Sequence, residues 1–366
     1  MAKVLDGAGD FLADAFPAAD PVALGFVPDL FLTELCCPSS GAEKAIQQNL
    51  KRWRCAGLPA DSLARALLDN QVIFTAADIQ NGPIPADKVL VFFSPRYLPG
   101  TIQQKLVDFV KQGGTLLLYG ELPEYDLEGA PCAILLDALS LPKPQYRQNA
   151  QPRSFLTVSV CGALAGSAAD NRANFAQCFP QMPEGILSPY GTELCCGFIR
   201  PLGQGKVAAV TCDYPNDPAF YRQLFKELGL KGVLQTPHSR RGIFASRLQG
   251  KKGGELLCLL NLDYTDKTLP VLLNGQKLFD SLTLEAKAGV LLPLDFPVAG
   301  AVICLSDAEL VASTADSLTL RTTQQGRGRL VIAGREPLPA ENVKVTAAKE
   351  GFLTEISGSE VTIHLR

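Results

Sequence analysis

The sequence predicts a multi-domain chain in which an α/β domain with a mostly parallel sheet precedes one or two antiparallel β-sandwich domains. Its 366 residues exceed what one ordinary hydrophobic core holds. Strand and helix patterns alternate from residue 21 to about residue 237, which is typical of parallel sheets covered by helices. After His238 the helical periodicity ends and short apolar runs recur between turns, as in antiparallel sandwiches. We therefore expect a connector at 1–20, the α/β domain at 21–237, a small sandwich at 238–311 and a C-terminal β-domain at 312–366.

The α/β domain opens with a buried strand at Val22–Val27, a short apolar run. We interpret residues 29–41 as a loop. The next helix, Ala45–Gly57, carries apolar residues on one face. Further along we expect a helix at Asp61–Leu68 with Asp61 as N-cap, strands at Val72–Thr75, Val89–Phe93 and Thr115–Tyr119, and, between Pro99 and Gly114, a helix with Ile102, Leu106, Phe109 and Val110 in one stripe.

The α/β pattern returns after an irregular, partly β insertion near residues 150–200. A strand at Lys206–Thr211 leads into a helix for which Asp217 is the expected N-cap and Pro218 the first helical residue. A hairpin is expected around Gly203–Gly205. This strand completes the predicted parallel sheet.

The β-rich part consists of short strands separated by turns. The last one alternates apolar and polar side chains, which leaves His364 on the solvent side. The expected strands are Glu255–Leu262, Thr268–Leu273, Gly289–Leu292, Gly300–Leu305, Leu318–Arg321, Arg329–Ala333, Val343–Ala347, Phe352–Ile356 and Val361–Leu365.

Composition excludes several classes of function. The net charge is −3 and the basic residues are scattered, so we expect no nucleic-acid partner. No apolar stretch reaches the ~18 residues that suggest a membrane span. The eleven cysteines are odd in number, many lie in apolar runs, and the acidic start lacks the pattern of an export signal. We expect reduced thiols in a cytoplasmic protein.

Motifs for metal, cofactor or nucleophilic chemistry are missing. His238 and His364 are the two histidines, and no C-x-x-C occurs, so we expect no metal and no cofactor. The glycine-rich stretches 203–207 and 324–329 are interpreted as turns. Asn261–Asp266 has the oxygen ligands that calcium uses, but an Asx-turn explains the same residues.

One acidic cluster falls where open α/β sheets bind ligands, at the carboxyl ends of the strands. Glu121, Glu124 and Asp126 follow the strand at Thr115–Tyr119. Glu34 follows the first strand, and Asp213 follows the last one, shortly before Asp217. We treat these as ligand-edge candidates; a solvated rim with helix caps is the alternative.

Three segments resemble a known family. They are "VALGFVPDLFLTEL", "SPRYLPGTIQQKLVDFVKQGGTLLLYGELPEYDLEGAPCAILLDAL" and "GQGKVAAVTCDYPNDPAFYRQLFKELGL". They resemble the region after the catalytic barrel of bacterial β-galactosidases of glycoside hydrolase family 35, in a subgroup whose arrangement is similar to family 42. The resemblance covers nearly all of residues 20–310. It implies an amidotransferase/flavodoxin-like α/β domain, similar to class I glutamine amidotransferases, followed by small β-domains.

Two departures from these families bear on catalysis. The catalytic glutamates of the β-galactosidases lie on a (β/α)₈ barrel, and we expect this chain to begin after such a barrel. An active amidotransferase carries a cysteine in a glycine-flanked elbow and a histidine near the last strand. Here the corresponding stretches hold Glu121-Leu122-Pro123 and Cys212 without a histidine. We therefore expect no catalytic residue and no independent activity.

The leading hypothesis is a non-catalytic C-terminal portion of a β-galactosidase-like glycoside hydrolase. Its partners would be the catalytic barrel of the same or a parent protein, a second copy of itself, and a galactoside at the acidic rim. One alternative is a carbohydrate-binding module, although residues 238–366 offer few aromatic side chains and no tryptophan. The other alternative is an independent amidotransferase-like enzyme or hydrolase.

Overall fold

The chain forms two compact units, described separately here from a computed structural model. The structure describes residues 8–35, 40–54, 59–86, 89–148, 155–236 and 242–366. The α/β unit comprises 20–70 and 74–231, and the β unit comprises the described part of 1–19 with 71–73 and 232–366. His238 lies outside the described residues.

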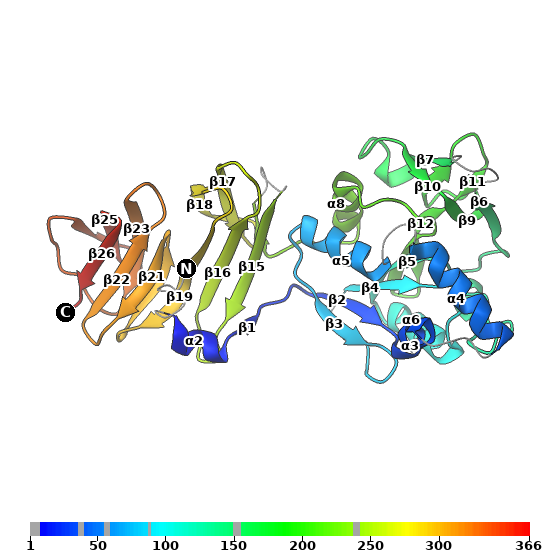
Figure 1. The fold of residues 1–366 in the computed structure, drawn as a ribbon, viewed down its shortest axis with the longest axis horizontal. Coiled ribbons are helices and arrows are strands. Elements are labelled where there is room, and N and C mark those ends of the chain that lie inside the picture. The colour runs from blue at the N-terminus through cyan, green and yellow to red at the C-terminus, as the bar shows by residue number, and fades with distance from the viewer. Residues whose placement is uncertain (1–7, 36–39, 55–58, 87–88, 149–154, 237–241) are drawn as a thin grey trace. The chain divides into compact units, whose positions relative to one another are not determined.

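The α/β unit is built on a nine-stranded mixed sheet (Figure 1). Five neighbouring strands, in the order β3-β2-β4-β5-β13, run parallel, and the four that follow, β12-β10-β7-β8, run antiparallel. A mostly parallel sheet was expected, but only the part from β3 to β13 is parallel. The antiparallel strands β12, β10, β7 and β8 come from the irregular insertion, which adds them to the same sheet. The strands are β2 Val22–Phe26, β3 Thr75–Asp78, β4 Val89–Ser94, β5 Thr115–Gly120, β7 Leu156–Val160, β8 Asn171–Ala173, β10 Gly185–Pro189, β12 Gly197–Leu202 and β13 Gly205–Val210.

Helices and a second, small sheet complete this unit. The three-stranded sheet has the order β11-β9-β6. The segment expected to be a loop after β2 contains helix α3, and the strand expected at Val72–Thr75 begins instead at Thr75. The remaining elements are α3 Pro28–Leu35, α4 Gly41–Arg54, α5 Pro59–Asp69, α6 Gly100–Lys111, α7 Ile134–Ala138, β6 Gln145–Gln148, the 3₁₀ turn Gly162–Leu164, β9 Phe175–Pro180, β11 Leu194–Cys195 and α8 Pro218–Glu227.

The alternation of side chains along β4 and β5 assigns the helices to the two faces of the sheet. Leu116 and Leu118 point to one face, where they share a buried cluster with Ile102 and Leu106 of α6. Tyr119 points to the other face, where its ring lies edge-on to Trp53 of α4, with centroids 5.6 Å apart. As expected, Asp217 caps α8, accepting hydrogen bonds from the amides of residues 219 and 220.

The β unit contains one long antiparallel sheet and two small ones. The eight-stranded sheet has the order β1-β15-β16-β19-β20-β23-β25-β24, and the three-stranded sheets are β14-β17-β18 and β21-β22-β26. Each small sheet contributes to its own buried cluster with part of the long sheet. The elements are α2 Gly9–Asp14, β1 Phe16–Pro17, β14 Leu234–Gln235, β15 Ile243–Gln249, β16 Glu255–Asn261, β17 Lys267–Leu273, β18 Gln276–Leu284, β19 Gly289–Val298, β20 Ala301–Ser306, β21 Ala308–Ser313, β22 Ser317–Thr322, β23 Arg327–Ala333, β24 Val343–Ala348, β25 Gly351–Ser357 and β26 Glu360–His364.

The expected boundaries differ from this arrangement in two places. The boundary between residues 311 and 312 falls inside β21, and β20 pairs with β23, so the long sheet joins the two expected domains. The expected connector instead supplies α2 and β1, and β1 pairs with β15. His364 is exposed on β26, as the alternation predicts.

Candidate functional site

The parallel strands β4 and β5 end at the same level, and their ends hold the candidate site. Ser94 and Gly120 are partners in register, and the amide of Glu121 donates to the carbonyl of Ser94 over 2.7 Å. Gly120 has φ +124°, and a Cβ there would lie 2.2 Å from that carbonyl oxygen. Glycine therefore lets the chain turn sharply and aim Glu121 back into the unit.

Glu121 lies inside the α/β unit and is 1% exposed. Its Oε2 accepts hydrogen bonds from Asn49 Nδ2 and from Trp53 Nε1, the latter over 3.0 Å. Its Oε1 is buried without a hydrogen-bond partner among the described residues. Burial raises the pKa of Glu121, and the hydrogen bonds from Asn49 and Trp53 oppose that rise. Glu121 was expected at a ligand-binding edge of the sheet, but its carboxylate points into the α/β unit.

Glu124 is held by a guanidinium and a phenol. Its Oε1 accepts from Arg96 Nε over 2.9 Å and from the hydroxyl of Tyr146, and the side chain is 8% exposed. Tyr146 also receives a hydrogen bond from Gln177, over 3.2 Å. Burial first, and then Glu121 and Glu124, raise the pKa of Tyr146, so it stays protonated and serves as a donor to Glu124.

Arg96 belongs to a continuous row of cations and rings, which we call the arginine–aromatic row. It runs through Arg52, Phe175, Tyr146, Arg96, Tyr125 and Tyr97, which come from α4, β9, β6 and the loops after β4 and β5. The successive separations are 4.6 Å, 5.7 Å, 4.6 Å, 5.1 Å and 5.4 Å, measured from guanidinium carbon to ring centroid or between ring centroids. Such contacts favour cations lying over ring faces, so the row fixes both guanidiniums.

The other predicted edge residues do not join this row. Asp126 accepts from the amides of residues 128 and 130 and shapes a turn. Asp213 accepts from the amides of Asn174 and Phe175 over 2.7 and 2.9 Å, which fixes the start of β9. Burial raises the pKa of Asp213, and these hydrogen bonds oppose the rise. Glu34 lies in α3, and its side chain is outside the described part of the chain.

Sequence reasoning missed the residues that build the site around the two glutamates. Arg96 follows β4 directly, so the rule that selected Glu121 would also have selected it. Asn49 and Trp53 lie on the buried face of the helix predicted at 45–57, whose apolar face indicates packing and gives no sign of a polar contact. Tyr146, Phe175 and Gln177 come from the irregular part of the chain, where no pattern connects them with the strand ends.

The thiols and the possible metal ligands offer no reactive centre in the described residues. Cys178, Cys195, Cys196 and Cys212 are buried free thiols. Burial raises the pKa of Cys178 to about 12 and that of Cys195 to about 11, so neither forms a thiolate at neutral pH. No group of three or more His, Cys, Asp or Glu side chains in the described ranges could hold a metal ion. Asn261 accepts from the amide of residue 263, as an Asx-turn requires.

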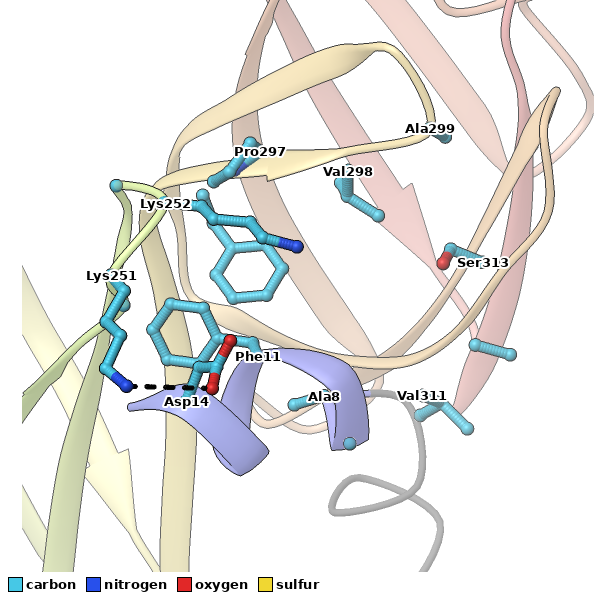
Figure 2. A pocket seen from close by; sticks show the side chains of 15 residues that line it. Ala8, Phe11, Asp14, Lys251, Lys252, Pro297, Val298, Ala299, Val311 and Ser313 are labelled. Atoms are coloured by element: carbon cyan, nitrogen blue, oxygen red, sulfur yellow. Dashed lines mark ion pairs between the residues drawn. The ribbon is translucent and has the colours of Figure 1, made fainter. Parts of the chain in front are cut away.

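A separate pocket of about 610 Å³ lies in the β unit beside α2 (Figure 2). The rings of Phe11 and Phe296, with centroids 4.9 Å apart, line this pocket, and so do Lys251 and Asp14, whose Nζ and carboxylate oxygen lie 3.9 Å apart. Phe11 packs on Gly250, where a Cβ would lie 2.4 Å from the ring. The packing of α2 against the rest of the β unit explains why the rings of Phe11 and Phe296 are in contact. The residues that line the pocket include no histidine or cysteine.

Among the described residues, no helix combines the length and the apolar composition that a membrane crossing requires.

Comparisons with known proteins relate the chain to glycoside hydrolases. A family described as "GLMA-like, second domain" matches residues 39–170. An exo-β-D-glucosaminidase of Thermococcus kodakarensis is 23% identical in an alignment of 339 positions that covers 84% of this chain and 41% of that protein. The chain thus spans about two fifths of the length of this relative.

Solved β-galactosidases share the fold over a similar extent. That of Bacillus circulans sp. alkalophilus matches with a TM-score of 0.60 and 17% identity, over 80% of this chain and 43% of that one. That of Rahnella sp. R3 matches with a TM-score of 0.59 and 16% identity, over 76% and 41%. A family 42 β-galactosidase of G. stearothermophilus gives a TM-score of 0.55 at 13% identity, over 76% and 40%. The chain is therefore similar to a part of glycoside hydrolases that fold in this way, while the assignment to family 35 stays a prediction.

Proposed function

We propose that this chain is a non-catalytic accessory region of a glycoside hydrolase, one that packs beside a catalytic barrel and contributes to the rim of its sugar site. The observation that carries the proposal is the state of the two strand-end glutamates. Glu121 is sealed inside the unit, and Glu124 is tied to Arg96 and Tyr146. A general acid and a general base must both reach the substrate, and the burial of Glu121 prevents this for the pair.

The relatives support the same reading. The matched exo-β-D-glucosaminidase and β-galactosidases are more than twice as long as the part that this chain covers. A domain of the amidotransferase-like kind, without a nucleophile and base, fits an accessory role in such proteins. Its partners would be the barrel of the same or a parent protein and a second copy of this chain. Reduced, buried thiols favour a cytoplasmic location.

Turnover by the isolated chain tests this proposal. We expect no release of nitrophenol from aryl β-galactosides or aryl β-glucosaminides and no ammonia from glutamine, with an intact β-galactosidase as the positive control. Turnover that the Glu124→Gln variant abolishes would overturn the proposal and favour an independent enzyme. Light scattering of the purified chain tests self-association, for which a stable dimer or trimer is the expected result.

Carbohydrate binding by the β unit is a second candidate, which one residue favours. Tyr264, in the loop between β16 and β17, is 82% exposed, and Lys287 covers one ring face from 3.8 Å. The other face would be available for stacking on a sugar. Loss of galactoside binding in Tyr264→Ala would support this candidate, and unchanged binding would end it.

A further inference from the structure

We propose that Arg96, Glu124 and Tyr97 form a binding site for a neutral sugar, in which the ion pair recognises two adjacent hydroxyl groups. This inference rests on the proposed accessory role and names the ligand chemistry of its rim. It assigns the contact to the Arg96–Glu124 pair and excludes Glu121, which no ligand reaches.

Within the part of the chain that the structure describes, the ion pair leaves four of the five guanidinium N–H donors of Arg96 and one oxygen of Glu124 open. Arg96 uses Nε for Glu124, and its Nη1 and Nη2 have no hydrogen-bond partner among the described residues. Glu124 receives both of its hydrogen bonds on Oε1, which leaves Oε2 open. The Arg96 side chain is 26% exposed, so solvent and solutes reach it. Two donor nitrogens thus lie beside one acceptor.

This combination matches the chemistry of a vicinal diol. Each hydroxyl group donates one hydrogen bond and accepts others, so one hydroxyl can donate to Glu124 Oε2 while its neighbour accepts from Arg96. Hydrogen bonds to an ionised donor or acceptor are stronger than those between two neutral groups. A carboxylate ligand would satisfy Arg96 but has no proton to donate to Glu124 Oε2, and the two negative charges would repel each other. The pair therefore favours a neutral sugar over an acidic one.

The arginine–aromatic row fixes the donors before a ligand arrives. The guanidinium carbon of Arg96 lies 5.1 Å from the centroid of the Tyr125 ring and 4.6 Å from that of the Tyr146 ring. Its orientation is further set by Glu124, which the Tyr146 hydroxyl holds. Little side-chain entropy remains to be lost on binding, which improves affinity.

Tyr97 supplies an apolar surface beside the pair. Its ring stacks on Tyr125 with an interplanar angle of 25°, and the guanidinium carbon of Arg96 lies 5.1 Å from the centroid of the same Tyr125 ring. Tyr97 ends the row, and its side chain is half-buried with no further ring of the described residues against it. Sugar sites combine such aromatic surfaces with a few fixed polar groups.

Titration of the full chain with methyl β-galactoside, followed by amide chemical shifts in NMR spectra, tests the site. We expect weak binding, with a Kd of about 1 mM or above, and shifts concentrated in residues 94–99 and 121–126. Tyr97→Ala and Arg96→Lys should each weaken binding about tenfold or more. Tyr97→Phe, which keeps the ring, and Tyr264→Ala, in the β unit, should bind as the parent does. Galacturonate should bind more weakly than the neutral sugar.

Several outcomes would overturn the inference. They are the absence of binding to the parent chain, full binding by a folded Tyr97→Ala variant, loss of binding in Tyr264→Ala, and preference for galacturonate. If Tyr97→Ala or Arg96→Lys does not fold, the location of the shifts in the parent decides. The outcome is separable from that of the proposed function, because turnover by the chain would end the accessory role whether or not Tyr97 contacts a sugar.

Discussion

At the scale of residues, the two carboxylate oxygens of Glu121 lie in different environments. Glu121 meets two donors through Oε2, while Oε1 is buried without a partner. An ionised carboxylate in that position keeps one oxygen unsolvated, which is the physical reason for its raised pKa. Burial thus disfavours the ionised form of Glu121 in the folded state relative to the unfolded state. This environment gives the first prediction.

Replacing Glu121 by glutamine should alter the pH dependence of stability. Because the folded-state pKa is raised, the contribution of Glu121 is fully present below its unfolded pKa and is lost as pH rises through the folded pKa. Glutamine keeps an acceptor for Asn49 and Trp53 but does not ionise. The stability of Glu121→Gln relative to the parent should therefore increase as pH rises above the unfolded-state pKa of a glutamate, about 4.3.

Urea unfolding of both proteins at several pH values measures this difference, and the subtraction removes the effect of Asp213, whose pKa burial also raises. Glu121→Ala, which leaves both donors unpaired, should lose about 1–3 kcal/mol at each pH. A relative stability of Glu121→Gln that falls with rising pH would show that the carboxylate is ionised and well satisfied.

The hydroxyl of Tyr146 should contribute to stability apart from its ring. Tyr146→Phe keeps the contacts with Arg96 and Phe175 but removes the hydrogen bonds to Glu124 and Gln177. We expect a loss of about 1–2 kcal/mol in the free energy of unfolding. Tyr190→Phe, on an exposed loop, is the control and should be neutral. Equal values for the two variants would mean that Glu124 does not depend on the phenol.

At the scale of elements, the sequence predicted those helices and strands that have a periodic pattern of apolar residues or a cap residue. The parallel strands β2, β4, β5 and β13, the helix α6 and the capped helix α8 each have a local signal and lie close to where they were expected, whereas β3 begins three residues later than expected, at Thr75. Helix α3 was missed because glycine, proline and cysteine follow it closely and suggested a loop. The hairpin expected around Gly203–Gly205 is present as the antiparallel pair of β12 and β13. The pairing of β10, β7 and β8 onto the same sheet was not predicted, because the order of strands across a sheet leaves no local pattern in the sequence.

The same difference between local patterns and tertiary packing explains how much of the candidate site could be predicted from the sequence. Strand ends are visible in a sequence, so Glu121 and Glu124 could be selected. Which of them faces solvent depends on Asn49, Trp53 and Tyr146, whose positions follow from tertiary packing. A carboxylate at a strand end is thus predictable, and its role is not.

The turn after β5 should tolerate no side chain at Gly120. An alanine there would combine a φ of +124° with a Cβ 2.2 Å from the carbonyl oxygen of Ser94. Gly191→Ala is the matched control, because it also has a positive φ but meets open space. We expect Gly120→Ala to lose at least about 2 kcal/mol more than the control in urea unfolding. Similar losses would mean that the strand end relaxes freely and does not fix Glu121.

At the scale of the whole molecule, the long sheet of the β unit decides which pieces can exist alone. Strands β20 and β23 pair across the expected boundary, and Ile303 shares one buried cluster with Leu330 and Ile332. Two cores under one continuous sheet behave differently from two domains joined by a linker, because removing one exposes the edge and the face of the other. The α/β unit has its own cluster, in which these residues take no part.

Truncation after residue 311 should therefore damage more than the residues it removes. It cuts inside β21, strips β23 from β20 and uncovers Ile303 and Phe296. We expect a truncated chain that aggregates or binds a hydrophobic dye, with the exchange of amides in β19 and β20 greatly accelerated while those in β4 and β5 remain protected. Amide hydrogen exchange followed by mass spectrometry measures both regions in one experiment. Truncation after residue 231, between the two units, is the control and should leave β4 and β5 protected as well. Unchanged protection of β19 and β20 in the first truncation would mean that residues 312–366 form a separate domain after all, and that the shared sheet adds little to stability.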